Sequence, residues 1–165
     1  MADQLELRKI NPVAIPAALE KAERYRLLNE PEQAESICLD VLAVDSHNQR
    51  ARKMLVLALT DQFLTRAAAA KKARAQIAEL SSEYEQIYYT GLICEREARA
   101  HLTRGVSAAF AHDLFLEAIE LYARAEGLAP EGNNDPILRR NSCLRTMAGE
   151  GLEPLTQSPS ELPLE

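Results

Sequence analysis

The segment from Ala18 to Asn48 constrains the fold more than any other part of the chain. In its first half, apolar residues recur with the three- and four-residue spacing of one helix face, at Ala18, Ala22, Tyr25 and Leu28. Pro31 then breaks the pattern, and a proline suits the first position of a new helix but no interior one. A second apolar helix face follows, at Ala34, Ile37, Cys38, Val41, Leu42 and Val44. Because so short a helix pair cannot bury its apolar faces alone, the segment predicts neighbouring units of the same kind.

The same pattern returns about 34 residues further along the chain. At this offset four apolar positions of the first pair stay apolar, with Val56, Leu59, Ala68 and Ala75 replacing Ala22, Tyr25, Ala34 and Val41. Residues 49–82 are therefore predicted to form a second helix pair. A third pair is expected between Tyr84 and Leu128.

These spacings resemble the tetratricopeptide repeat (TPR), a two-helix unit of about 34 residues. In the first pair the resemblance is carried by Ala22, Tyr25, Ala34, Cys38, Val41 and Leu42, with Ser46 at the family's usual proline position. In the third pair it is carried by Ala118, Ile119, Tyr122, Ala125, Leu128 and Pro130. The resemblance covers roughly residues 15–147. It implies an all-α fold, a TPR-like superhelical solenoid of about three antiparallel helix pairs plus a C-terminal capping helix.

The third unit is longer than the family pattern. The interval from Gly91 to Ala118 exceeds the family spacing by about 15 residues. Either longer helices or an inserted turn would accommodate the extra residues.

Cap and turn residues define the expected boundaries. Helices are predicted over about 16–29, 31–44, 47–61, 66–80, 84–104, 107–128 and 136–147. Ser46 with Gln49, and Ser82 with Glu85, have the spacing of capping boxes, and Thr65 is the expected cap of the fourth helix. The chain is thus divided into an N-terminal lead-in (1–14), a TPR-like helical domain (15–148) and a disordered acidic tail (149–165).

Composition argues against several classes of function. The net charge is −6, and the tail contributes Glu150, Glu153, Glu161 and Glu165 without a basic residue, so the remainder is nearly neutral. A nucleic-acid partner is not expected, because that role needs a basic surface. No apolar run approaches the roughly 20 residues that span a membrane, and the N-terminus lacks the pattern of a secretion signal. Three widely spaced cysteines are expected to be reduced, which indicates a cytoplasmic location.

The sequence contains no pattern that predicts catalysis, a metal or a cofactor. His47, His101 and His112 share no metal-ligand spacing with each other or with the cysteines. Cys94 and His101 are two helical turns apart, about 10 Å, which is too far for a nucleophile and its base. A Gly-rich phosphate loop and a serine nucleophile elbow are both missing. The protein is therefore not expected to be an enzyme.

The TPR resemblance implies where a partner would bind. In that family the first helix of each pair lines a concave groove, and eight residues are predicted to contact a partner there: Arg50, Lys53, Met54, Leu57, Tyr88, Tyr89, Leu92 and Arg96. Arg139 or Arg140 would join them from the last helix. Met and Tyr offer adaptable apolar contact, and Arg or Lys holds a carboxylate. The alternative is that these basic side chains are simply solvated.

The expected function is therefore a non-catalytic protein–protein interaction module, an adaptor or assembly scaffold in a bacterial-type cytosol, that binds a peptide or protein segment in the groove. One alternative is a self-associating structural homo-oligomer, for which a homodimer is the simplest form. Another is a small TPR-type chaperone for an exported protein. Recognition of chaperone tails is disfavoured, because Leu19 and Glu23 occupy the positions at which the family places a carboxylate-binding Lys and Asn.

Overall fold

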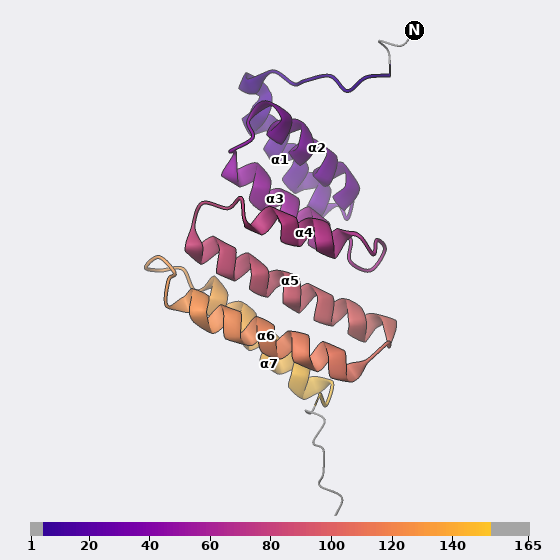
Figure 1. Cartoon of the computed structure of the whole chain (residues 1–165), viewed down its shortest axis with the longest axis vertical. Coiled ribbons are helices and arrows are strands. Elements are labelled where there is room, and N and C mark those ends of the chain that lie inside the picture. The colour runs from indigo at the N-terminus through magenta and orange to yellow at the C-terminus, as the bar shows by residue number, and fades with distance from the viewer. Residues whose placement is uncertain (1–4, 153–165) are drawn as a thin grey trace, which may run out of the picture.

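The computed structural model describes residues 5–152, and within that range every regular element is a helix. The elements are η2 (Pro12–Ala14), α1 (Ile15–Leu27), α2 (Pro31–Val44), α3 (Gln49–Thr60), α4 (Ala69–Ile77), α5 (Glu83–Arg104), α6 (Ala108–Glu126) and α7 (Asp135–Gly149). They stack in chain order from one end of the molecule to the other (Figure 1). The all-α prediction is confirmed for the described residues. The predicted tail lies outside them from residue 153 onward.

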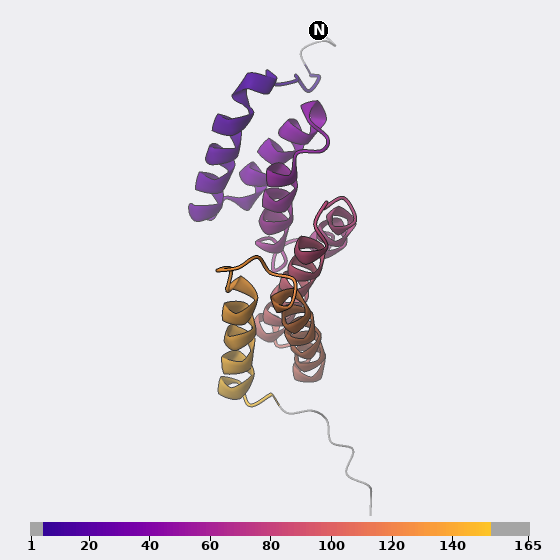
Figure 2. The same cartoon turned by 90° about the vertical axis from the view of Figure 1, so that its left-hand side faces the viewer.

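Each helix packs against the next one along the chain, and the odd-numbered helices also meet one another. α1 contacts α3, and α3 contacts α5. Side-chain hydrogen bonds join α5 to α7, for example from Arg99 to Thr146. In the turned view α1 and α7 lie on the same side of the stack (Figure 2). We call the surface shared by α1, α3, α5 and α7 the odd-helix face.

The 34-residue offset holds for the first helices of the first two pairs and fails for the second helices. Val56 and Leu59 are fully buried, as is Ala22 at the equivalent place in α1. In α4, however, Ala69 and Ala73 are the buried residues, whereas Ala68 and Ala75 are exposed. The pairing predicted for those two alanines is therefore wrong, and the buried counterparts of Ala34 and Cys38 lie 35 residues later, at Ala69 and Ala73.

The shift arises in the turn before α4. The side chain of Gln62 is buried there and donates to Glu35 Oε2 at 2.8 Å and to the Ala58 carbonyl at 3.0 Å. Thr65 donates its hydroxyl to the Gln62 carbonyl instead of capping a helix. α4 therefore begins at Ala69, later than predicted, and is only nine residues long.

Of the other predicted helix starts, two are confirmed and one is wrong. Ser82 accepts a hydrogen bond from the Glu85 amide, and Ser107 accepts one from the Phe110 amide. At α3 the cap is Asn48, which accepts from the Ala51 amide at 2.9 Å, and not Ser46. Gln49 is then free to bond with the Glu79 carbonyl and the Ser81 amide, so it fixes the start of α3 to the α4–α5 connection.

The extra residues of the third pair lengthen its helices. α5 has 22 residues and α6 has 19, and the two join at Gly105, whose φ of 65° favours glycine. The helices cross closely at Gly91, where an added Cβ would lie 3.1 Å from the Tyr122 ring and 3.3 Å from Leu121 Cβ. Because Tyr122 is fully buried, it has little room to move away.

We predict that Gly91→Val destabilises the protein by about 2–3 kcal/mol, because the larger side chain overpacks the α5–α6 crossing. Urea denaturation followed by circular dichroism measures this. Gly127→Ala is the matched control, since its new Cβ would meet the nearest atom at an ordinary 3.5 Å. Equal stability of the two variants would contradict the close crossing.

Candidate functional site

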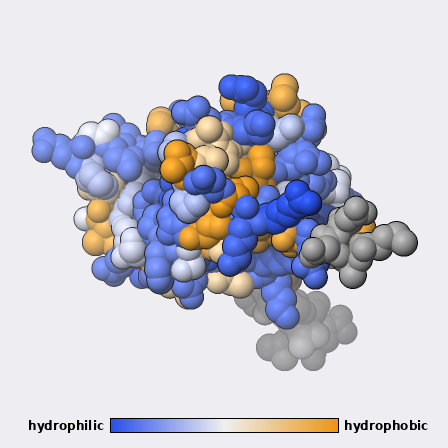
Figure 3. All heavy atoms as spheres, turned by 90° about the horizontal axis from the view of Figure 1, so that it is seen from above, coloured by the Kyte–Doolittle hydropathy of each residue, from blue (hydrophilic) through white to orange (hydrophobic). Residues whose placement is uncertain are grey.

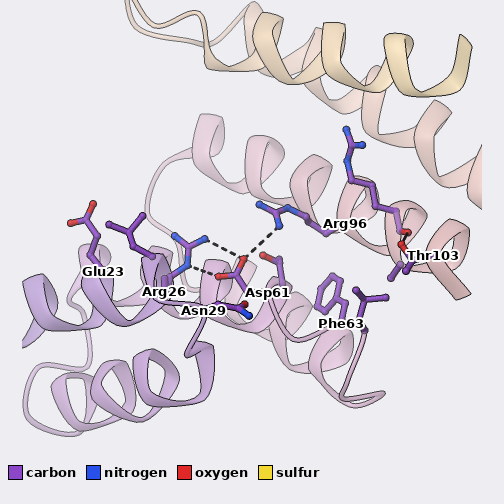
Figure 4. A pocket seen from close by; sticks show the side chains of 12 residues that line it. Glu23, Arg26, Asn29, Asp61, Phe63, Arg96 and Thr103 are labelled. Carbon is purple, nitrogen blue, oxygen red and sulfur yellow. Dashed lines mark hydrogen bonds and ion pairs between the residues drawn. The ribbon is translucent and has the colours of Figure 1, made fainter. Parts of the chain in front are cut away.

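A cleft of about 370 Å³ opens on the odd-helix face, between the ends of α1 and α3 and the second half of α5 (Figure 4). Its charged lining residues are Glu23, Arg26, Asp61, Arg96 and Arg99. The last turn of α1 borders the cleft because α1 ends abruptly there. Asn29 adopts a φ of 59°, a left-handed conformation that asparagine tolerates better than most residues, and Pro31 starts the next helix.

Asp61 joins three successive units of the stack. It lies directly after α3, and its carboxylate accepts from Arg26 Nε of α1 at 2.7 Å and from Arg26 Nη2 at 3.3 Å. Arg96 of α5 approaches the same carboxylate with Nη1 at 3.5 Å (Figure 4). One acidic group is therefore shared by two guanidinium groups.

Arg96 is incompletely neutralised by this arrangement. Its Nε is buried and has no hydrogen-bond partner among the described residues. Burial lowers the pKa of Arg96, and the charge of Asp61 raises it in part. Since arginine stays protonated in proteins, the cleft presents a cation with spare donor capacity.

A second, buried carboxylate fixes the position of Arg99 at the cleft. Glu95 is fully buried and receives Arg139 Nη2 at 2.7 Å, Arg99 Nε at 2.9 Å and the Tyr122 hydroxyl at 2.6 Å. The remaining nitrogens of Arg99 donate to Ser142 and Thr146 of α7. Arg99 is thus held in place by neighbours on both sides before any ligand arrives.

Of the eight predicted partner-binding residues, Arg96 lines this cleft and the other seven lie elsewhere. Met54 and Leu92 are only 8% and 3% exposed, so in this conformation they support α3 and α5 and offer little surface. Arg50 is exposed and Leu57 is half-buried.

The other three predicted residues belong to a polar and aromatic strip on the same helices. Lys53 forms an ion pair with Glu85 at 2.6 Å. Tyr88 and Tyr89 meet edge to face with ring centroids 5.2 Å apart, and burial raises the pKa of each to about 12. Both hydroxyls therefore stay protonated at neutral pH.

The sequence interpretation missed Arg26, Asp61 and Arg99 as groove residues. Asp61 lies in a turn, beyond the helical periodicity that predicts the groove residues. Arg99 follows Glu95 by four residues and pairs with it, as this helical spacing allows, but its place at the cleft depends on α7. Arg139, an expected groove residue, instead contacts Glu95.

The thiols are poorly suited to nucleophilic chemistry. Cys38, Cys94 and Cys143 are all buried and free, and burial raises their pKa values to about 12, 11 and 12. Across residues 5–152, no cluster of three or more His, Cys, Asp or Glu side chains has a geometry that could hold a metal ion. In the same range, none of the helices is both long enough and apolar enough to cross a membrane. The cleft offers arginines, which can bind an anion, beside the carboxylates of Glu23 and Asp61; its threonine hydroxyls already donate to backbone carbonyls.

We predict that Glu95→Ala destabilises the fold by about 3–5 kcal/mol, because Arg139 and Arg99 lose their shared counter-ion. Tyr122→Phe should cost only about 1–2 kcal/mol, since Glu95 Oε2 still receives Arg139 Nε at 3.1 Å. Urea denaturation measures both. A smaller cost for Glu95→Ala than for Tyr122→Phe would contradict the network.

The raised thiol pKa values predict a loss of stability at alkaline pH. In the unfolded chain the thiols have a pKa near 9.0, whereas in the folded protein their pKa values are about 11 or 12. The stabilisation is therefore complete below pH 9 and is lost as the pH rises, by about 1 kcal/mol per thiol at pH 10. Denaturation with reductant at pH 8 and pH 10 tests this. A variant with all three cysteines changed to alanine should show a flatter dependence.

Comparisons of the chain with models of protein families, with curated proteins and with solved structures find no match.

Proposed function

We propose that this protein is a TPR-like solenoid of about three helix pairs closed by α7, and that it acts as a non-catalytic protein–protein interaction module. Three features support the architecture. Successive helices pack on one another, α1, α3 and α5 meet along one face, and buried Ala22 of α1 recurs as buried Val56 of α3 at a 34-residue offset. The adaptor or scaffold role, a cytoplasmic location and a bacterial-type cell belong to the same proposal.

The proposed ligand is an acidic segment of a partner protein. The observation that carries this is the state of Arg96, a half-buried cation whose charge is balanced only by a weak 3.5 Å contact to a carboxylate that is already paired with Arg26. An incoming carboxylate would accept from the exposed part of the Arg96 guanidinium, since the side chain is 33% exposed although its Nε is buried. Arginine binds such groups with two parallel hydrogen bonds, which gives direction as well as affinity.

The tyrosines of the polar and aromatic strip would extend the contact between Arg96 and the partner segment. Tyr88 and Tyr89 precede Arg96 by about two helical turns, or about 11 Å along α5. An extended peptide covers that distance with about four residues. A partner segment with an apolar or aromatic residue about four positions from an acidic one would therefore contact both parts of the odd-helix face. A chaperone for an exported protein would use the same surface and is an untested variant of this proposal.

We predict that peptides selected from a random display library on the immobilised protein are enriched in Asp and Glu. Arg96→Gln should weaken their binding by about 10- to 100-fold, because it removes a charge-assisted hydrogen bond. Binding should also fall as salt concentration rises. Fluorescence anisotropy with a labelled selected peptide measures both effects.

Arg145→Gln is the matched control for that experiment, because it makes the same change of charge at an exposed position of α7. Circular dichroism and the melting temperature establish that both variants stay folded. Selected peptides without acidic residues, or equal binding by Arg96→Gln and the wild type, would overturn the proposed ligand class.

A further inference from the structure

The α1–α2 end of the stack has an apolar groove that residues 5–152 leave open. The groove has a volume of about 270 Å³, and its lining includes Ile10, Ala14, Ala17 and Ile37, together with the charged residues Lys21 and Asp40. Figure 3 looks onto this end and shows apolar surface gathered near its centre with hydrophilic residues around it. Val13, beside the groove in sequence, is also largely exposed.

At the opposite end α7 packs on α6 and buries its own Cys143 and Pro136, while Leu116 of α6 and Leu138 of α7 stay partly exposed. Stacked helical units need a polar or covered outer surface at each end, because each unit buries its apolar face only against a neighbour. The α1–α2 end lacks such a cover within the described residues.

A short arm with unmatched apolar side chains lies next to this groove. Residues 5–9 are non-helical, and Leu5 and Leu7 are 92% and 96% exposed. The next residue after the arm, Ile10, packs against the core residues Leu19 and Val41. In an extended chain, residues two apart project to the same side, so Leu5 and Leu7 can enter one groove together.

We propose that two copies of the chain pair through their α1–α2 ends, with the arm of residues 5–9 of each copy lying in the groove of the other. A second copy is the fitting occupant because one reciprocal contact covers both unmatched surfaces at once. A foreign segment in the groove would leave the arm leucines in water. Such a two-fold arrangement closes on itself and stops at a dimer.

The charges of the two surfaces are compatible with this pairing. The arm carries Glu6 beside Arg8 and Lys9, and the groove carries Lys21 and Asp40, so each sign has a counterpart. Pairing in this way uses the first turns of α1 and leaves the cleft at its last turn open.

Sedimentation equilibrium of the full chain, from about 1 µM to about 1 mM, tests the proposal. The wild type should reach twice the 18.3 kDa mass of one chain. The arm variant, Leu5→Ser with Leu7→Ser, should weaken the dimer at least about 100-fold. The groove variant, Ala17→Glu, should do the same and still fold, because an acidic residue is favourable in the first turn of a helix.

Two controls make the result specific. Val106→Ser with Leu138→Ser removes apolar side chains that are 67% and 63% exposed but lie in other parts of the chain, and it should leave the dimer unchanged. Mixing the arm variant with the groove variant restores one intact arm–groove contact, so the mixture should dimerise where each variant alone does not.

Three results would overturn the proposal. The first is a wild type that keeps the mass of one chain throughout the concentration range. The second is a dimer that both variants leave unchanged, which would place the interface on another face. The third is a mixture of the two variants that remains monomeric, which would exclude the reciprocal exchange of arms.

Discussion

The carboxylate of Glu95 is the interaction on which the C-terminal half of the molecule depends. A fully buried charge is costly unless several groups compensate it, and Glu95 receives donors from Arg99, Tyr122 and Arg139. These donors come from α5, α6 and α7, so three helices must be in register before the charge is satisfied. The register of α7 is set in this way even though its own apolar face is thin. Arg99 is then oriented at the cleft as a consequence.

Arg96, the residue after Glu95, connects α5 to the N-terminal half of the molecule. Glu95 points to α6 and α7, whereas Arg96, one position on, approaches Asp61 and through it Arg26 of α1. Adjacent residues on a helix point about 100° apart, so α5 can serve both neighbours at one level. The buried carboxylate of Glu95 has a donor on each of its oxygens. In the cleft, the contact between Arg96 and Asp61 leaves Arg96 Nε without a hydrogen-bond partner among the described residues. We therefore regard the Glu95 network as structural and propose that the surface around Arg96 receives an anion.

The helices were predictable because their signals are local, whereas the cleft depends on contacts that the sequence does not reveal. Apolar spacing and the caps Ser82 and Ser107 located most helices, since both act within a few residues. The register of α4 was not predicted, because the alanine-rich segment before it has a strong helix propensity. The buried amide of Gln62 bonds with Glu35 and holds this segment as a turn, a tertiary effect that outweighs the propensity. Asp61 was missed for a related reason: its partners Arg26 and Arg96 are 35 residues before and after it, and helical periodicity does not extend through a turn.

The two surfaces proposed to bind partners lie on different parts of α1 and can act independently. The end groove uses Ala14 and Ala17 near the start of this helix, and the cleft uses Arg26 near its end, about 14 Å further along the axis. The groove is apolar and would contribute mainly through burial, whereas the cleft is charged and would be sensitive to salt. A dimer formed through the groove therefore carries two open clefts. A partner with two acidic segments would bind such a dimer more tightly than either cleft alone allows, provided that its linker reaches both sites.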